Sequence, residues 1–532
     1  MGPFVVLLSR KKRLRSCQLQ SQPMYTQQEL DAKLLAAANA LRGPIDPADF
    51  KAYIFPLLFL KHISDTWNWE YQRALEIFDG DKDLALLPDN YRFIVPQAPD
   101  GNRDASTPKG CAWEDLLALE ENVGAGLQLI FDRLQEANPE TLAGVFGAAQ
   151  WANKAILPEE RLTSVVDVFT SLKLDPESVT HDLLGNAYEY LLKYFADGSG
   201  TKAGEFFTPR AVVRLMVRML EPEAGESIYD PTCGSGGMLV ESVNTVRAHG
   251  QDPRELRLFG QEVSATTAGI ARMNLYIHDI ETFEVKRGDT LRDPRLRKPD
   301  GSLQQFDVVI ANPPFSIGRE TPWGHEAWAH DPFGRAAFGV PPRSFADFAF
   351  VEHMLASMNP ETGRLAVVMP HGVLFRGTES GIRQGILEAG LVEAVIGLPP
   401  NLFYGTQLAA CLLVCRATPA VGREKAVLFL NGSARFEKGR PKNVMSDADV
   451  ASILDTYQRG EDVDSGVPAR LVPLHEISDN DWDLNIGRYV IAEADPEVEA
   501  SVAVASYIEG RDELRAAEEL LDERLAEAGF LA

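Results

Sequence analysis

The sequence lacks the features that would place it in a membrane or in an oxidising compartment. Its 532 residues contain no apolar run of the roughly 18–20 residues that a transmembrane helix needs. Its five cysteines form neither a Cys-x-x-Cys pair nor a set with metal-ligand spacing, so we expect no disulfide framework and no metal site. The first residues are apolar and a basic cluster follows them, which is the reverse of a secretory signal. These observations predict a cytoplasmic protein without a membrane partner.

Basic residues are also outnumbered: 52 Lys and Arg stand against 77 Asp and Glu, which gives a net charge of -25. Phosphates attract Lys and Arg and are repelled by an acidic surface, so the chain alone is poorly suited to grip a long duplex. A nucleic-acid substrate would require a partner chain, or basic groups gathered in one cleft. The alternative is that the acidity serves only solubility.

The pattern of apolar residues divides the chain into five parts. Residues 1–23 have a basic cluster and no amphipathic period, and are interpreted as a disordered or mis-annotated extension, with a nucleic-acid arm as the alternative. The spacing of apolar residues predicts a helical domain over residues 24–165 and an α/β domain over residues 166–435. Residues 436–495 form a C-terminal extension, and residues 496–532 predict a charged helix whose narrow apolar stripe pairs with another chain or folds back.

Several local expectations follow from the periodicity. In the helical domain, residues 53–60 predict a buried helix capped by Asp49, and residues 113–137 and 141–146 predict further helices. In the α/β domain we expect seven or eight strands in a mixed sheet that ends near residue 435. Beyond it, residues 444–457 predict a helix and residues 478–490 an extended segment.

A glycine-rich turn follows the first strand of the α/β domain. Residues 226–230 predict a strand, residues 231–237 read Pro-Thr-Cys-Gly-Ser-Gly-Gly, and residues 238–248 predict a helix. Glycines let the backbone approach a ligand closely. The spacing is neither Gly-x-Gly-x-x-Gly nor a P-loop. Asp230, directly before the turn, suits the amino group of a bound amino acid, which a dinucleotide lacks.

Polar side chains also follow the next three predicted strands. Residues 256–262 end in Glu262, which suits the two hydroxyls of a ribose. A third strand near residues 283–286 is followed by Asp289, which suits an adenine amino group, and a fourth ends at Asn312. Because the carboxyl ends of parallel strands share one edge of a sheet, we expect these residues to lie together.

Asn312 begins the segment Asn312-Pro313-Pro314-Phe315. Proline fixes φ and stiffens the turn. The Asn312 side-chain oxygen and the Pro313 carbonyl are two acceptors that suit an amine with two N–H donors, such as that of adenine, and Phe315 offers a face for stacking. The alternative is a strand-terminating turn with a core phenylalanine.

Two flanking segments complete the candidate site. Before the glycine turn, Thr208 is interpreted as the N-cap of a helix and Pro209 as its first-turn residue. After Phe315, residues 317–342 predict a long loop of the kind that forms lids. Its Trp323, Trp328 and Phe333 either contact an extruded base or pin the loop to the protein.

Together these motifs resemble the adenine-N6 DNA methyltransferases, most closely the modification subunit of type I restriction–modification systems. The resemblance covers roughly residues 24–490, includes a later segment at residues 483–489, and has the motif order of that branch. It implies a Rossmann-like S-adenosylmethionine-dependent methyltransferase sheet with an all-α N-terminal domain and a helical C-terminal tail. It implies site-specific transfer of a methyl group to N6 of a flipped adenine.

The resemblance also implies roles for individual residues. Asn312 to Phe315 would form the catalytic segment, with no metal. The residues that would bind S-adenosylmethionine are Glu205, Phe206, Phe207, Thr208, Pro209, Arg210, Asp230, Gly234, Ser235, Gly236, Gly237, Glu262 and Asp289. Cys233 stands inside the cofactor turn without an assigned role. The implied partners are DNA, a specificity subunit bound by two modification subunits, and, as a candidate, a restriction subunit.

Three other functions fit part of this pattern. The same motif serves methyl transfer to a glutamine amide of a protein or to RNA, because an amide nitrogen has the same delocalised lone pair. A donor-binding scaffold without activity would need only the pocket. A self-contained DNA enzyme would need a recognition element within residues 436–532, which are short and acidic.

Overall fold

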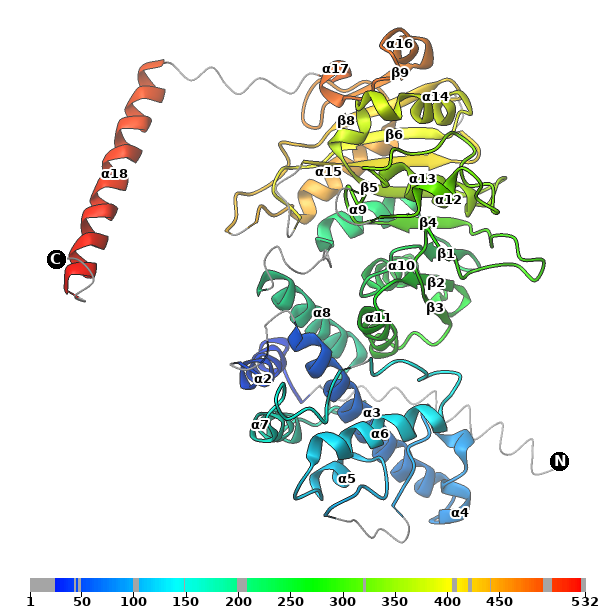
Figure 1. Ribbon diagram of the computed structural model, residues 1–532, viewed down its shortest axis with the longest axis vertical. Helices are drawn as coiled ribbons and strands as arrows, with labels where there is room; N and C mark the ends of the chain where they lie inside the picture. The colour runs from blue at the N-terminus through cyan, green and yellow to red at the C-terminus, as the bar shows by residue number, and fades with distance from the viewer. Residues whose placement is uncertain are drawn as a thin grey trace.

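The computed structural model describes residues 24–42, 45, 49–98, 105–147, 149–198, 208–318, 322–403, 409–419, 423–440, 442–490 and 500–527. Figure 1 shows a helical part, a sheet with helices on both faces, and a C-terminal helix that stands apart from both. The predicted fold class, a mixed α/β sheet preceded by an all-α region, is confirmed.

The helical part is built around one long buried helix. Its elements are α2 (Gln27–Ala40), α3 (Phe50–Ile77), α4 (Lys82–Ala85), η2 (Pro88–Asn90), α5 (Trp113–Leu117), α6 (Val123–Ala137), α7 (Glu159–Thr170) and α8 (His181–Gly198). A capping box of Thr26 and Glu29 starts α2, because each side chain satisfies a backbone N–H that the helix leaves unpaired. The run predicted to be buried lies at the centre of α3, but Asp49 makes no side-chain capping bond there.

Two helix predictions in this part were wrong. Residues 113–137 are not one helix, because the chain turns between α5 and α6, where Asn122 has a φ of 53°. Residues 141–146 form turns rather than a helix. Gly144 has a φ of 70° there, which a right-handed helix does not accommodate.

The described strands form one nine-stranded sheet in the order β3-β2-β1-β4-β5-β7-β6-β8-β9. They are β1 (Ser227–Asp230), β2 (Arg257–Glu262), β3 (Phe283–Arg287), β4 (Val308–Ala311), β5 (Arg364–Pro370), β6 (Val392–Gly397), β7 (Ala410–Arg416), β8 (Ala426–Asn431) and β9 (Ala469–Pro473). Strands β1 to β5 are all parallel to one another, whereas β7 is antiparallel to both β5 and β6. Therefore β6 and β8 run in the same direction as β4. The sheet does not end near residue 435 as predicted, because β9 adds an edge strand.

Helices cover both faces of this sheet. They are α9 (Arg210–Leu220), α10 (Gly237–Ala248), α11 (Ala265–Ile277), α13 (Asp347–Ala356), α14 (Ser380–Glu388) and α15 (Asp447–Arg459). Because side chains alternate along a strand, Val308 and Ile310 pack with α9 and α10, whereas Val309 and Ala311 pack with α13. All four are buried, which explains why β4 is a continuous apolar run.

The remaining elements are short pieces that follow or connect the strands, and the long helix α18 beyond the sheet. They are η5 (Pro253–Glu255), α12 (His325–Trp328), η6 (His371–Leu374), η7 (Gly377–Glu379), α16 (Leu474–Asp479), α17 (Ile486–Tyr489) and α18 (Ala500–Glu527). The prediction of an extended segment at residues 478–490 was wrong, since it holds the end of α16 and all of α17. Long-range contacts decide this, because Leu484 donates to the Leu374 carbonyl and Tyr489 packs on Phe429.

Helix α11 joins the helical part to the sheet. Its Ala271 and Leu275 face the sheet, whereas its Ile270 and Tyr276 belong to the core of the helical part. The Tyr188 hydroxyl of α8 donates to the Ile270 carbonyl at 2.9 Å, and the Tyr276 hydroxyl donates to the Thr141 carbonyl at 3.1 Å. A helix that is buried on two sides fixes the position of the helical part against the strands that carry the candidate site.

Among the helices described, none combines the length and the apolar character that a bilayer crossing requires.

Candidate active site

Four of the residues predicted from strand ends lie at one edge of the sheet. Strands β3, β2, β1 and β4 are consecutive neighbours, all parallel. Their carboxyl ends carry or precede Asp289, Glu262, Asp230 and Asn312. The structure therefore brings these side chains to one edge, where open α/β sheets bind their ligands.

Asn312 presents an unused acceptor at this edge. Its side-chain N–H donates to the Thr208 hydroxyl at 2.8 Å. Its Oδ1 is buried and has no hydrogen-bond partner among the described residues. A buried acceptor without a partner costs about 1–3 kcal/mol, so the position indicates a ligand donor.

Thr208 does not cap helix α9 as the sequence predicted. Helix α9 begins at Arg210 after Pro209, and no side chain caps it. The Thr208 hydroxyl instead holds the Asn312 amide from the segment preceding α9. A contact between residues 104 positions apart has no signature in the local sequence.

Two aromatic rings lie beside Asn312. The rings of Phe315 and Phe403 have centroids 6.1 Å apart at an angle of 62°. Phe403 is buried and follows β6, whose carboxyl end lies at the same edge as that of β4. The sequence analysis did not identify Phe403. Its signal was Leu398-Pro399-Pro400, a proline pair after an apolar strand like the pair that follows Asn312.

A buried carboxylate fixes the turn after Phe315. Ser316 has a φ of 54°, and its backbone N–H donates to Asp347 Oδ1 at 2.7 Å. Asp347 also accepts from Arg376 at 2.6 Å, and Arg376 donates to Glu379 at 2.7 Å. Arg376 and Glu379 follow β5, so this network ties the Asn-Pro-Pro-Phe turn to the end of the neighbouring strand.

The glycine turn after β1 is held in one conformation. Gly234 and Gly236 have φ values of 52° and 81°, in the left-handed region that residues other than glycine rarely adopt. Asn274 of α11 donates to the Ser235 carbonyl at 2.9 Å and fixes the turn from below. Gly237 is the first residue of α10, so the turn opens directly onto a helix.

Asp230 is the buried charge of this turn. It is 2% exposed, and its Oδ1 accepts from the Thr232 N–H at 3.0 Å. Burial raises the pKa of the carboxyl to about 8, against the lowering effect of the Thr232 N–H. A ligand ammonium group would supply the countercharge that the carboxylate lacks.

Cys233 faces the protein interior rather than the turn's open side. It is 5% exposed, and a Cβ on Gly260 of β2 would lie 2.9 Å from its sulfur. Burial raises the pKa of the thiol well above its ordinary value. The thiol therefore packs on the glycine of the adjacent strand as a small apolar group.

The two remaining carboxylates organise their own loops. Glu262 accepts from the Gly234 and Ser264 N–H groups at 3.1 and 2.8 Å, while burial raises its pKa. Asp289 Oδ1 accepts from the Leu291 and Arg292 N–H groups at 3.0 and 3.1 Å. Both carboxylates thus shape the loops in which they lie, and each keeps acceptor capacity for a ligand.

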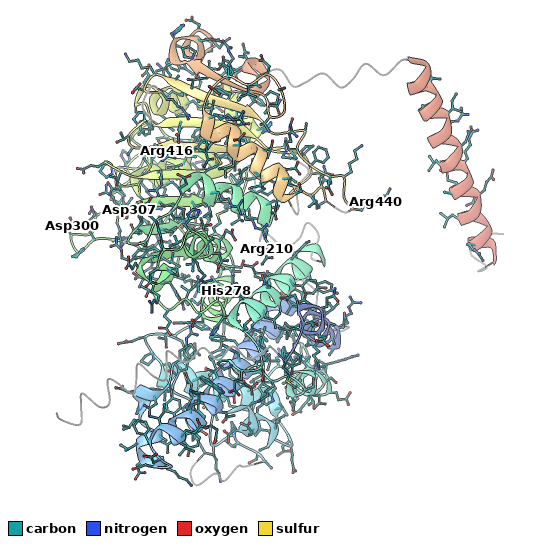
Figure 2. The ribbon with its side chains drawn as sticks, turned by 180° about the vertical axis from the view of Figure 1, so that it is seen from behind. Arg210, His278, Asp300, Asp307, Arg416 and Arg440 are labelled. Atoms are coloured by element: carbon teal, nitrogen blue, oxygen red, sulfur yellow. The ribbon has the colours of Figure 1, made fainter. Side chains whose placement is uncertain are left out.

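The segment before α9 is only partly described. Glu205, Phe206 and Phe207 lie outside the described residues. Arg210 points toward α8, where it pairs with Glu189 and donates to Asn186 at 3.2 Å. In Figure 2 Arg210 is labelled between the sheet and the helical part.

The long loop after the motif is pinned to the protein. Trp323 and Trp328 are buried, which decides between the two roles considered for them. Buried Arg335 stacks on Trp328 at 4.3 Å and donates to the Thr290 and Leu291 carbonyls at 2.9 and 2.7 Å. These carbonyls directly follow Asp289, so the loop is attached to the end of β3.

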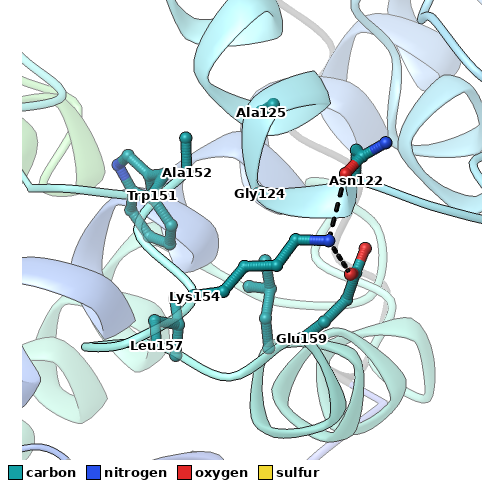
Figure 3. A pocket seen from close by; sticks show the side chains of 9 residues that line it. Asn122, Gly124, Ala125, Trp151, Ala152, Lys154, Leu157 and Glu159 are labelled. Carbon is teal, nitrogen blue, oxygen red and sulfur yellow. Dashed lines mark hydrogen bonds and ion pairs between the residues drawn. The ribbon is translucent and has the colours of Figure 1, made fainter.

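A separate hollow lies in the helical part and contains none of the predicted residues. In Figure 3 Lys154 extends across it, with its ammonium 3.0 Å from Asn122 and 2.6 Å from Glu159. Glu159 also accepts from the Val123 N–H at 2.8 Å, at the start of α6. The polar groups of Asn122, Lys154 and Glu159 are hydrogen-bonded to one another. Because Asn122 precedes α6 and Glu159 is the first residue of α7, these contacts tie together the starts of two helices.

Comparison with known proteins identifies the family. The N-6 DNA methylase family model matches residues 179–497, and the HsdM N-terminal domain model matches residues 30–169. The chain belongs to the N-6 DNA methylase family. This membership confirms the predicted resemblance to modification subunits of type I systems and the predicted class of enzyme, an adenine-specific DNA methyltransferase.

Relatives of this N-6 DNA methylase span most of its length. The MjaVII methylase subunit of a type I restriction enzyme from Methanocaldococcus jannaschii is 30% identical, over 87% of this chain and 78% of the relative. The MpnII methylase subunit from Mycoplasma pneumoniae is 28% identical, over 88% of this chain and 90% of the relative. A type I methyltransferase subunit from Streptococcus thermophilus has a similar crystal structure, with a TM-score of 0.73 and 29% identity, and the match covers 88% of this chain and 100% of that one.

Proposed function

We propose that this N-6 DNA methylase binds S-adenosylmethionine at the ends of β1 to β3 and methylates a flipped adenine held at Asn312. The observation that carries the proposal is the buried Asn312 Oδ1, an acceptor without a partner among the described residues, at the sheet edge that also carries Asp230, Glu262 and Asp289. The methyltransferase family implies a methyl donor, and the residues present fit this one.

The fit to the donor rests on the turn after β1. Buried Asp230 suits the donor's ammonium group, and the left-handed Gly234 and Gly236 allow close approach of the backbone to its amino-acid end. Glu262 and Asp289 suit its ribose and adenine. When bound, S-adenosylmethionine supplies a methyl group already activated by a positively charged sulfur.

The protein's task is then to prepare the acceptor nitrogen. The amine's lone pair is delocalised into the adenine ring. Hydrogen bonds from its two N–H groups to Asn312 Oδ1 and to the Pro313 carbonyl would localise that pair and orient it. The Thr208 hydroxyl keeps the Asn312 oxygen facing the base, because it accepts from the other end of the amide.

The aromatic rings suit the base itself. Extrusion of a base from a duplex costs a few kcal/mol. Stacking on an aromatic ring returns about 1–3 kcal/mol per base. Phe315, three residues after Asn312, lies next to Phe403, and we propose these two rings for this contact.

The proposed partners follow from the relatives. Type I systems place DNA reading in a specificity subunit, and we propose a complex of two copies of this chain with one such subunit, with a restriction subunit as a further candidate. Helix α18 is the proposed docking element. We propose a cytoplasmic location for the complex.

The decisive variant is Asn312→Ala. It removes one of the two acceptors and should abolish methyl transfer to DNA, while donor affinity stays close to wild type because Asn312 lies outside the glycine turn. Genome-wide detection of N6-methyladenine, in cells that make the chain with its neighbouring gene products, measures the first effect. Calorimetric titration with S-adenosylmethionine measures the second.

The two outcomes are clearly separated. A split target motif that is methylated with the wild-type chain and unmethylated with Asn312→Ala supports both the reaction and its dependence on a partner reader. Methylation at the wild-type rate in the variant would refute the role of Asn312. Methylation absent from DNA in both strains would favour a glutamine amide or RNA as the acceptor.

A further inference from the structure

A basic hairpin stands out on this acidic chain. Residues 433–440 and 442–443, here called the basic arm, contain four cations and a single carboxylate: Arg435, Lys438, Arg440, Lys442 and Glu437. Their net charge of +3 contrasts with the chain's total of -25. Lys438 and Arg440 are exposed, and Arg435 is half-buried. Within the described part of the chain, these three form no ion pair with a carboxylate.

The arm leaves the sheet at the edge that carries the candidate site. It follows β8, which is parallel to β6 and runs in the same direction as β4. Carboxyl ends of these strands share one edge, so the arm begins on the side where Asn312 lies. Figure 2 shows Arg440 projecting from the side of the molecule opposite Asp307, which directly precedes β4.

Hydrogen bonds connect the arm to the aromatic pair. Asn443 donates from its side chain to the Pro400 carbonyl at 2.8 Å and from its backbone to the Asn401 carbonyl at 3.1 Å. Lys442 donates to Asn401 Oδ1 at 3.0 Å. Pro400 and Asn401 directly precede Leu402 and Phe403, whose ring faces Phe315.

The backbone of the arm is also closed on itself. Glu437 and Val444 exchange two backbone hydrogen bonds of 2.8 and 3.0 Å across the hairpin. Such a closed hairpin presents Lys438 and Arg440 at its tip. Cations on a segment that is hydrogen-bonded next to an aromatic pair suit a nucleotide, which carries its charge on the phosphates flanking the base.

We propose that the basic arm binds the DNA phosphates that flank the flipped adenine. This inference rests on the proposed function. An extruded nucleotide remains attached to its neighbours, so its flanking phosphates must come to the edge that holds Asn312 and Phe403. On a chain of net negative charge, the arm supplies a local positive site there.

The test uses the complex of this chain with its co-expressed specificity subunit. The arm variant K438Q/R440Q removes two exposed cations from the hairpin tip. The control variant K298Q/K425Q removes two exposed cations before β4 and β8, at the opposite edge of the sheet. Asp300, in the same loop as Lys298, lies across the molecule from Arg440 in Figure 2. Both variants change the net charge equally.

The measurement is the salt dependence of binding to a fluorescein-labelled duplex that carries the target motif found by the N6-methyladenine mapping. Each lost phosphate contact lowers the slope of log K against log salt by about 0.9. The arm variant should therefore lose about 2 from the slope and roughly 30-fold in affinity at about 0.15 M salt. The control variant should match the wild type, and donor affinity should be unchanged in both.

Two results would overturn the inference. One is an arm variant whose slope equals that of the wild type or of the control variant. The other is loss of the specificity subunit from the purified arm variant, which would assign the arm to a protein contact. Failure of the wild-type complex to bind or methylate DNA would instead refute the proposed function, and needs no arm variant to be seen.

Discussion

At the scale of single residues, the candidate site is defined by polar atoms that are buried before any ligand is bound. Asp230 and Asn312 are the two clearest cases. Asp230 has lost most of its hydration, and the Asn312 oxygen has lost a hydrogen bond. Each of these groups is costly to bury without a partner, so each would gain from a donor or a base bound beside it.

Asp230 makes donor binding depend on pH. Its pKa of about 8 in the folded, donor-free protein means that it holds a proton at neutral pH. An ammonium group binds the ionised form, so donor binding should release a proton, and affinity should rise by up to about tenfold per pH unit until it levels off near pH 8. Calorimetry at pH 7 in two buffers of different ionisation enthalpy measures the released proton.

The matched variant for this prediction is Asp230→Asn, which should bind weakly and release no proton. The raised pKa of Asp230 also makes the folding stability of the protein depend on pH. Because burial raises the pKa, the contribution of Asp230 is fully present below the ordinary carboxyl range and is lost as the pH rises through about 8. Wild-type binding with no proton release would contradict the assignment of Asp230 to the ammonium group.

The sequence predicted the residues that follow strands, but not the contacts that residues from other segments make with them. Asp230, Glu262, Asp289 and Asn312 follow buried apolar runs, so local pattern and the parallel sheet were enough to bring them together. Thr208 and Phe403 come to Asn312 and Phe315 through long-range packing. No local period encodes such a contact, and Thr208 was therefore interpreted as an ordinary helix cap.

At the scale of elements, α11 carries the connection between the helical part and the sheet. Local periodicity predicted several helices, among them α3, α10 and α15, but it did not predict α11, which serves two cores at once. The errors fall where tertiary contacts override local preference, at the turns of residues 141–146 and at α16 and α17. Both regions pack against distant elements, Tyr276 in one case and Leu374 in the other.

The docking of α11 can be tested at Gly269. A Cβ at Gly269 would lie 2.4 Å from the backbone carbonyl oxygen of Val145 in the helical part. A backbone atom cannot relieve this clash by a change of rotamer, as a flexible side chain could. Gly269→Ala should therefore destabilise the protein by about 1–3 kcal/mol through overpacking. Thermal unfolding measured by calorimetry reports the change.

The control is Gly381→Ala in α14. A Cβ at this exposed position meets no atom within 4 Å, so alanine should be neutral or stabilising by up to about 1 kcal/mol. If Gly269→Ala unfolds at the same temperature as the wild type, the two parts are not fixed to each other through α11.

At the scale of the whole molecule, α18 is the element without a place in either core. Its Tyr507, Leu514 and Leu521 are 70%, 59% and 57% exposed. They stand seven residues apart, the spacing of a coiled-coil seam. An exposed stripe of this kind indicates a partner helix, in agreement with the proposed docking on a specificity subunit.

The double variant L514E/L521E tests that docking. Charges on the seam should remove the specificity subunit from the purified complex, while donor binding by the chain itself stays unchanged. Arg515→Glu is the matched control, because it changes the net charge by the same amount at an exposed position of α18 that lies about 100° around the helix from Leu514. Intact co-purification of the double variant would exclude α18 as the docking element.

The contact between Ser227 and Asp307 has a consequence for the reaction, although it lies at the edge of the sheet opposite the site. Asp307 accepts from the Ser227 N–H and hydroxyl at 2.9 and 2.7 Å, at the beginnings of β1 and β4. These strands pair directly through only two residues of each, Ile228 with Val308 and Tyr229 with Val309. A slip of two residues would move Asn312 by about 7 Å relative to Asp230. By fixing the register of β1 against β4 at the opposite edge of the sheet, Ser227 and Asp307 thus set the distance between Asp230 and Asn312, and with it the separation of the proposed donor and acceptor sites.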